Sequence, residues 1–346
     1  MNVIEIDGGI GEGGGQIIRT AIALSALTGK GTKIKNIRAK RCNPGLRPQH
    51  LTCIKAVGDL CNAELKYAEI GSHKLEFFPK KLSEKPMNIE IGTAGSVTLV
   101  IQSLLPVLTK VRKPVDIVIH GGTSVKWAPT IRYFEYVTIP LLNKFGFGFE
   151  LEMIKEGFYP TGGGEVILHV TPSFPKTIKL IEFGKIEKIS GCSYASDKLG
   201  VARVAERQMH AAQELIKKEL GITPEIEIEY HPASSIGSGI DLWCKGGYSI
   251  IGANHLGEKK KRAEDVGRLA AADLIKELKT SMPIDRYMGD QLIPFMAIST
   301  LKNKKECEIA VSKITEHCKT NIKIVEKFLP IKFNIKENKI KSKIRN

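Results

Sequence analysis

The chain of 346 residues lacks the features of several protein classes. Its 7 cysteines include no Cys-x-x-Cys pair, and their odd number argues against both a zinc ribbon and a secreted disulfide framework. The longest apolar runs, TAIALSAL and LVIQSLLPVL, fall short of the roughly 18 residues that a membrane-spanning helix needs. The start, MNVIEID, has no basic segment followed by an apolar one. We therefore expect no membrane association and a cytoplasmic location.

The chain has fewer acidic than basic side chains. Against 52 lysines and arginines stand 37 aspartates and glutamates, which gives a net charge of +15. Such an excess favours a polyanionic partner, because each neutralised phosphate releases condensed counterions. A lysine-rich solvated surface explains the same charge equally well. Charge alone leaves both interpretations open.

The glycine-rich stretch GGIGEGGGQ also lacks the partners of two familiar nucleotide motifs. It contains GIGEGG, but a dinucleotide site expects an acid about 20 residues later, and residues 29–40 contain none. The P-loop is excluded because Gly29-Lys30 is followed by glycine. What remains is a loop that can approach a phosphate at a helix N-terminus. Glu12 within it is suited to hold a divalent cation on that phosphate, or is a solvated loop acid.

One order of elements occurs three times along the chain. Strand-like NVIEID leads through glycines to a helical pattern at 16–27, and a second helix from Pro48 precedes alternating KLEFFP. The same order returns from MNIEIG onward, and a third time around a helix that contains TEHCKTNIKIVEKFL. The predicted fold class is therefore α/β (α+β), with three units of a sheet and two helices. We place the units at about 1–85, 86–166, and 167–183 plus 281–338.

Residues 184–280 interrupt the third unit. They read as strand, long helix, three strands and a charged helix, which predicts a smaller inserted α+β domain. Residues 1–183 and 281–346 then form the main domain. The last residues, 339–346, are predicted to be a basic solvated tail.

A basic cluster lies at the start of the helix near Pro48. Planar guanidinium groups suit a terminal phosphate better than lysines do, and a basic surface loop is the alternative. The side chains concerned are Arg38, Arg41, Arg47, Gln49 and His50.

His317 stands beside Cys318 in EHCKTN, and the pair alone does not show whether the histidine is a metal ligand, a core residue or a nucleophile. A disulfide between Cys307 and Cys318 is also left open.

Seven motifs in order give the chain a resemblance to the RNA 3'-terminal phosphate cyclase family over essentially its whole length. They are GEGGGQIIRT, NPGLRPQHLT, GTAGS, HGGT with WAP, FYPTGGGEV, YMGDQ and HCKTNIKIVEKFLP. The resemblance implies three units of a four-stranded sheet and two helices, like those of the enolpyruvyl transferases, plus a smaller inserted domain. The chain departs from the family in having Asn43 where a basic residue is common.

The family chemistry gives His317 the role of a nucleophile. The resemblance implies attack on the α-phosphorus of ATP, a covalent histidyl-AMP, transfer of AMP to an RNA 3'-phosphate to form an RNA-adenylate, and closure to a 2',3'-cyclic phosphodiester. ATP would be the cosubstrate, magnesium or manganese the divalent cation, and RNA with a 3'-phosphate end the partner.

The same resemblance assigns the surrounding residues. Contacts with ATP would come from Glu12, which would also hold the metal, and from Gln102, Pro129, Tyr287, Asp290 and Gln291. The RNA end and its phosphates would be held by Arg19, Arg38, Arg41, Gln49 and His50.

Two alternatives come from other classes. The family also includes a non-catalytic ribosome-biogenesis protein, but Glu12, Asp290 and His317 are all present here and favour an enzyme. An enolpyruvyl transferase shares the repeated unit, yet it would explain neither the inserted domain nor HCKTN.

Overall fold

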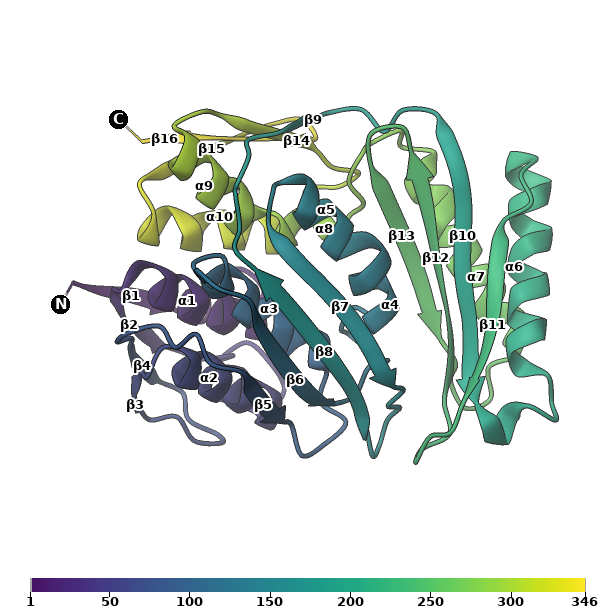
Figure 1. Ribbon diagram of the computed structural model, residues 1–346, viewed down its shortest axis with the longest axis horizontal. Coiled ribbons are helices and arrows are strands. Elements are labelled where there is room, and N and C mark those ends of the chain that lie inside the picture. Colours follow the sequence, from purple (N-terminus) through teal and green to yellow (C-terminus); the bar gives the residue numbers. More distant parts are fainter. Residues whose placement is uncertain (1, 346) are drawn as a thin grey trace.

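The computed structural model describes residues 2–345, and three of its four-stranded sheets share one strand order (Figure 1). In each of these three units the first two strands are parallel. The last strand of the unit lies between the second and the third and is antiparallel to both. Together with the fourth sheet described below, this confirms the predicted α/β fold of three repeated units with a smaller insert.

The first unit comprises β1 (Val3–Asp7), α1 (Gly15–Thr28), β2 (Gly31–Lys35), α2 (Pro48–Leu60), β3 (Glu64–Lys66) and β4 (Leu75–Phe78). The second has β5 (Met87–Glu90), α3 (Val97–Leu108), β6 (Val115–Gly121), a second helix in the segments α4 (Ile131–Tyr133), η1 (Phe134–Thr138) and α5 (Ile139–Lys144), then β7 (Gly148–Lys155) and β8 (Gly164–Thr171). The third consists of β9 (Lys179–Leu180), α8 (Met288–Gln291), α9 (Ile293–Asn303), β14 (Cys307–Ala310), α10 (Glu316–Phe328), β15 (Ile331–Lys336) and β16 (Lys339–Ile344).

The fourth sheet interrupts the third unit between its first strand and its first helix. It consists of β10 (Ile186–Ser196), β11 (Glu225–His231), β12 (Ser238–Gly246) and β13 (Ile250–Leu256), and it is accompanied by η2 (Asp197–Leu199), α6 (Val204–Leu220) and α7 (Ala263–Leu278). Figure 1 shows this sheet and its helices at one end of the molecule, away from both chain termini.

Local sequence explains where the helices begin and end. The Ser96 hydroxyl accepts a hydrogen bond from the Leu99 amide and caps α3. The Thr315 hydroxyl likewise accepts a hydrogen bond from the Cys318 amide and caps α10. Gly29 ends α1 in the left-handed conformation, at a φ of 71°. These caps fix the ends of helices that carry site residues.

Two hydrophobic cores match this division. One continuous core runs through all three units, while a separate core fills the space between the fourth sheet and its helices, with Ile189, Leu242 and Leu274 among its members. The exact domain boundaries at 184 and 280 stay a prediction. No helix among residues 2–345 is long and apolar enough to cross a membrane.

Two predicted boundaries are wrong. The second unit does not end at residue 166, because β8 continues to Thr171 and belongs wholly to the second sheet. Of the predicted solvated tail at 339–346, residues 339–344 form β16, which pairs with both β14 and β15, and residue 346 lies outside the described residues. The physical reason is period-two alternation: Ile340 and Ser342 are fully buried, whereas Lys339 and Lys343 face solvent.

The cysteines form no disulfide in the described part of the chain. Cys307 and Cys318 are free and buried, so the pairing left open above is not present.

Truncating the chain before Lys339 should unfold the third unit, since it exposes β14 and β15 along their paired edges and leaves Thr300 without its hydrogen bond to Ser342. We expect a loss of cooperative thermal unfolding, or a melting temperature lower by more than 10 °C as a rough figure, in circular dichroism. The control is Lys343→Gln, whose side chain faces solvent. A truncated chain that melts like the full chain would contradict the role of β16.

Candidate functional site

Helices of all three units surround a cavity of about 580 Å³. Its polar lining comes from α1 and the loop before it, from α3, from α8 and the residues preceding it, and from α10. Leu99, Pro106, Phe134 and Phe295 add an apolar wall. A pocket of this size, mostly apolar with a few converging polar groups, is typical of a site for a small ligand.

His317 lies in the first turn of α10, at the edge of the cavity. Its Nε2 atom is 3.2 Å from Oε2 of Glu12, and the two side chains are 44% and 51% exposed. The same Glu12 oxygen is 3.4 Å from a guanidinium nitrogen of Arg41. The glycine loop can lie this close to α10 because Gly11, at a φ of 56°, has no side chain; a Cβ there would be 2.5 Å from the Thr320 hydroxyl. Loop and helix thus bring a carboxylate, an imidazole and an arginine together.

Cys318 does not share a site with its neighbour, because its side chain is fully buried while His317 is half-exposed. Among residues 2–345 no group of three or more His, Cys, Asp and Glu side chains is arranged to hold a metal ion. The structure therefore does not support a protein-only zinc site at EHCKTN.

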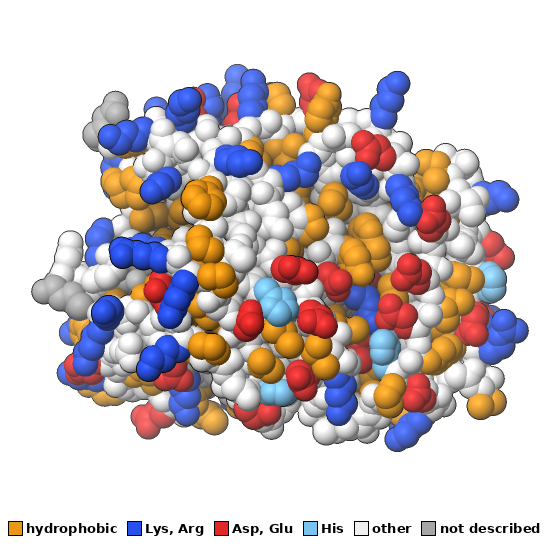
Figure 2. All heavy atoms as spheres, in the orientation of Figure 1, with side chains coloured by type: hydrophobic (Ala, Val, Ile, Leu, Met, Phe, Trp, Pro, Cys, Tyr) orange, Lys and Arg blue, Asp and Glu red, His pale blue; other side chains and the backbone are white. Residues whose placement is uncertain are grey.

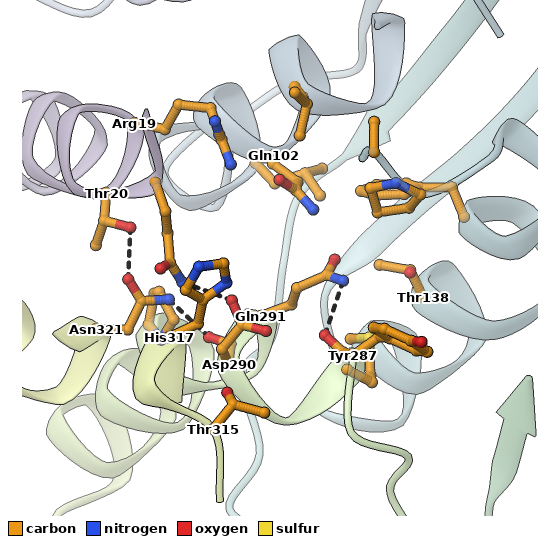
Figure 3. A pocket seen from close by; sticks show the side chains of 18 of the residues that line it. Arg19, Thr20, Gln102, Thr138, Tyr287, Asp290, Gln291, Thr315, His317 and Asn321 are labelled. Atoms are coloured by element: carbon orange, nitrogen blue, oxygen red, sulfur yellow. Dashed lines mark hydrogen bonds between the residues drawn. The ribbon is translucent and has the colours of Figure 1, made fainter. Parts of the chain in front are cut away.

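A hydrogen-bonded network joins α1, α8 and α10 beneath the histidine (Figure 3). The Gln16 amide donates to Oδ2 of Asp290 at 2.5 Å, and the Asn321 amide donates to the Asp290 carbonyl at 2.9 Å. The Thr20 hydroxyl in turn donates to Asn321 at 2.7 Å. Burial raises the pKa of Asp290 to about 7, and the positive charge of Arg19 opposes that rise. Asp290 thus titrates in the neutral range.

Arg19 points into the cavity from α1 (Figure 3). Burial lowers its pKa, and no carboxylate within the described residues forms an ion pair with it. A guanidinium on a cavity wall without a paired carboxylate is suited to bind an anionic ligand group.

The opposite wall is built around Tyr287. Its ring is 50% exposed, and its carbonyl accepts a hydrogen bond from the Gln291 amide at 3.1 Å (Figure 3). Gln102 and Pro129 line the same cavity from the second unit. A half-exposed aromatic ring and a proline offer flat apolar surface for a planar ligand group.

Asp285, which sequence analysis did not single out, holds this wall in place. Its Oδ1 atom accepts hydrogen bonds from the Tyr287 and Met288 amides at 3.0 and 2.9 Å, where α8 begins. Oδ2 accepts from the Gly252 amide of β13 at 3.1 Å, and the Tyr133 hydroxyl donates to both oxygens. One buried carboxylate therefore fixes the second unit, the fourth sheet and the start of α8 relative to one another.

The predicted site residues fall into two groups. Eight of them line the cavity: Glu12, Arg19, Gln102, Pro129, Tyr287, Asp290, Gln291 and His317. The other four, Arg38, Arg41, Gln49 and His50, do not line it. Arg41 lies at the edge of the cavity, where it forms an ion pair with Glu12. Arg38 donates to the carbonyls of Asn43 and Gly45, and Gln49 donates to the Ser96 carbonyl at 3.1 Å.

His50 packs against the glycine loop, where a Cβ on Gly15 would be only 2.2 Å from its Nε2 atom. Burial, with help from the charges of Arg19, Arg38 and Arg47, lowers the pKa of His50 to about 3. The ring is therefore neutral at physiological pH, and its Nδ1 atom accepts a hydrogen bond from the Arg47 amide at 3.1 Å.

Sequence analysis also missed cavity residues outside the quoted motifs. Arg286, Lys313 and Asn254 line the cavity, and Asn254 comes from the inserted segment. The helix start at 288 was a signal for Asp285, since an aspartate before a helix commonly accepts from its first amides. No sequence pattern singles out Asn254.

Surface charge is divided unevenly despite the net charge of +15. Figure 2 shows lysines and arginines mainly over the first and third units, while acidic side chains and histidines gather in the middle of this face. The second sheet carries pairs of this kind, such as His169 with Asp116 at 2.8 Å and His120 with Glu165 at 3.7 Å. The acidic middle of this face is therefore unfavourable for a polyanion.

Fold and cavity define a three-unit α/β protein with a cavity between the units. A sequence model described as RNA 3'-terminal phosphate cyclase matches residues 10–335. Proteins named RNA 3'-terminal phosphate cyclase from Methanopyrus kandleri and Thermococcus kodakarensis are each 45% identical to this chain. Their alignments cover 97% of it and 96% and 95% of the relatives. A protein of the same name from Saccharolobus islandicus is 45% identical over 96% of both chains. The chain belongs to the RNA 3'-terminal phosphate cyclase family.

Asp285 should make stability depend on pH. Burial raises its pKa from 3.8 to about 6, so the folded state binds its proton more tightly than the unfolded chain. Its contribution to stability is fully present below about pH 4 and is lost as the pH rises through 6. The unfolding free energy of the wild type, relative to Asp285→Asn, should fall by about 2–3 kcal/mol between pH 4 and pH 7.

Urea unfolding at several pH values measures this difference. Asp265→Asn is the control, since that carboxyl is half-exposed on α7 and pairs only with Arg268. A pH-independent difference between wild type and Asp285→Asn would show that the Asp285 carboxyl is ionised at little cost.

Proposed function

We propose that this protein uses ATP to convert an RNA 3'-terminal phosphate into a 2',3'-cyclic phosphodiester, through a covalent histidyl-AMP. The observation that carries the proposal is the placement of His317. Its half-exposed imidazole lies at the edge of a cavity of nucleotide size, with Nε2 beside a carboxylate and an arginine. Membership of the family and the names of its relatives give the substrate class.

In the first step a ring nitrogen of neutral His317 attacks the α-phosphorus of ATP. A nitrogen–phosphorus bond forms, the bond to the bridging oxygen breaks, and pyrophosphate leaves. The ring then loses its remaining N–H proton, so that the imidazole of the phosphoramidate is neutral. An imidazole is nucleophilic near pH 7, and a covalent intermediate divides a difficult activation into two easier steps.

Two further displacements complete the reaction. An oxygen of the RNA 3'-phosphate attacks the AMP phosphorus, which releases His317 and forms an RNA-adenylate. The neighbouring ribose 2'-hydroxyl then attacks the RNA phosphorus, gives up its proton, and expels AMP. The sum is one ATP consumed, with AMP, pyrophosphate and the cyclic end as products.

Positive groups stabilise the phosphate charge that accumulates. Arg19 points into the cavity and Arg41 lies at its edge, so these two are best placed to contact phosphates. The N-terminus of α10 adds a partial positive charge next to His317. Arg38, Gln49 and His50 would support the RNA end by shaping the loop and helix beneath it, since their side chains bond to backbone groups of the protein.

Glu12 is the residue that would hold a divalent cation, magnesium or manganese. Such an ion is usually bound by one or two carboxylates together with phosphate oxygens of the substrate. One half-exposed carboxylate at the cavity edge fits that arrangement, because the remaining ligands would come from ATP and water. The cation would offset phosphate charge during the attack.

The adenine would lie between Tyr287 and Pro129, with Gln102, Asp290 and Gln291 around the nucleotide. Asp285 positions this wall through its bonds to the Tyr287 and Met288 amides. The inserted segment, residues 184–280, takes part through Gly252 and Asn254. We therefore propose that the insert completes the nucleotide site and is not a separate module.

Replacing His317 with alanine should abolish adenylylation. Incubated with α-labelled ATP and magnesium or manganese, the wild type should retain acid-labile label, and His317→Ala should retain less than about a thousandth of it, since the nucleophile itself is missing. His255→Ala is the matched control, because that histidine pairs with Asp273 on the insert. Label on a folded His317→Ala variant would contradict the role of His317 as the nucleophile. An unlabelled wild type would favour the alternative that this protein is a non-catalytic member of the family.

Asp285→Asn should raise the KM for ATP about tenfold or more, since an amide cannot accept the Gly252, Tyr287 and Met288 hydrogen bonds together, and each lost bond costs about 1 kcal/mol. The rate of adenylylation at saturating ATP should change little, because His317 is untouched. Glu156→Gln is the control: that carboxylate is equally buried, but its partners Thr123, Ser124 and Arg132 lie off the cavity. Equal effects from both variants would indicate general destabilisation.

A further inference from the structure

Trp127 is the most exposed aromatic side chain at the cavity. It lines the cavity edge, yet 96% of its surface is open to solvent. Its backbone has a φ of 63°, in the left-handed region that is unfavourable for a bulky residue by about 1–2 kcal/mol.

The second tryptophan shows the contrast. Trp243 of β12 stacks on Tyr136, with ring centroids 4.2 Å apart and planes within 3°. Among residues 2–345, Trp127 has no such aromatic partner, either stacked or edge-on. Its flat faces are available to a ligand.

The turn that carries Trp127 is rigidly anchored on both sides. Before it, Lys126 forms an ion pair with Glu258 at 2.8 Å. After it, the Pro129 carbonyl accepts a hydrogen bond from Thr98 at 2.7 Å, and the Thr130 hydroxyl donates to buried Asp241. The backbone of this turn is thus held in place, so a ligand that stacks on the indole does not have to order the loop first.

We propose that Trp127 is a stacking platform for a nucleobase of the RNA substrate, next to the 3'-terminal nucleotide and outside the cavity. Single-stranded RNA is commonly held by bases stacked on aromatic side chains. A small ligand such as ATP is mostly enclosed by its pocket. A polymer whose end reaches His317 must instead leave the cavity and cross its edge, where Trp127 lies. Lys313, which lines the same cavity, is placed to contact the phosphates of the entering chain.

The proposal rests on the proposed function and specifies how its RNA is bound. Because every base has an aromatic face, the platform should accept any base at that position but should require an unpaired one. It should contribute to RNA binding and cyclisation, and should leave adenylylation of His317 by ATP unchanged.

Fluorescence tests the platform directly, because the chain has 2 tryptophans. In Trp243→Phe, which keeps an aromatic ring against Tyr136, Trp127 is the one remaining indole. A 3'-phosphorylated single-stranded oligoribonucleotide should quench its emission in a saturable way. An oligonucleotide of the same length that is abasic at the residue before the 3' end should quench it much less, and so should ATP alone.

Activity provides the second arm. Trp127→Ala should raise the KM for that oligonucleotide about 5- to 100-fold. The label transferred from α-labelled ATP to the protein should stay at the wild-type level. Trp127→Phe should restore most of the affinity, which a merely structural role would not predict. Unchanged RNA kinetics in Trp127→Ala, or quenching by ATP and not by RNA, would overturn the platform. Absence of labelling in the wild type would instead overturn the proposed function.

Discussion

Each unit buries one face of its sheet under two helices and leaves the outer faces of those helices to be covered by another unit. The whole structure depends on this mutual covering: α1 packs against α3 of the second unit and α10 of the third, and α2 also packs against α3. The cavity lies where the helices of the three units meet. Side chains from all three units therefore converge on this cavity. Figure 1 shows the helices of the three units side by side around the centre of the main domain.

Polar groups on the covering faces need partners, because an unpaired buried group costs about 1–3 kcal/mol. The network of Gln16, Thr20, Asn321 and Asp290 meets this need for α1, α8 and α10. Asp285 does the same where the second unit, the fourth sheet and α8 meet. The residues that satisfy the interfaces thus also fix the cavity walls, which is why stability and ligand binding are expected to be coupled at these positions.

The sequence predicted the helices and strands well because their burial follows regular periods. The glycine loop could be placed at the start of α1, and the motif residues around Tyr287 and His317 do meet at the cavity. The order of motifs could not show that Gln49 turns to the second unit while His50 packs against the start of α1, since both lie in the same helix start as the arginines. Nor could it show that Asp285 bonds to Gly252 across the insert. Such contacts depend on packing between distant segments.

The Lys-rich C-terminal segment was predicted to be a solvated tail and is a strand. Its alternation of buried and exposed residues is short, and its lysines dominate the composition.

The central claim is that the cavity couples ATP cleavage to closure of an RNA 3'-phosphate. The most direct measurement follows a 3'-³²P-labelled oligoribonucleotide with the purified protein and a divalent cation, with and without ATP. With ATP, the account predicts that the label becomes resistant to phosphatase as a 2',3'-cyclic phosphate, with one AMP and one pyrophosphate formed per end. A label that stays phosphatase-sensitive, or an end that closes equally well without a nucleotide, would contradict it.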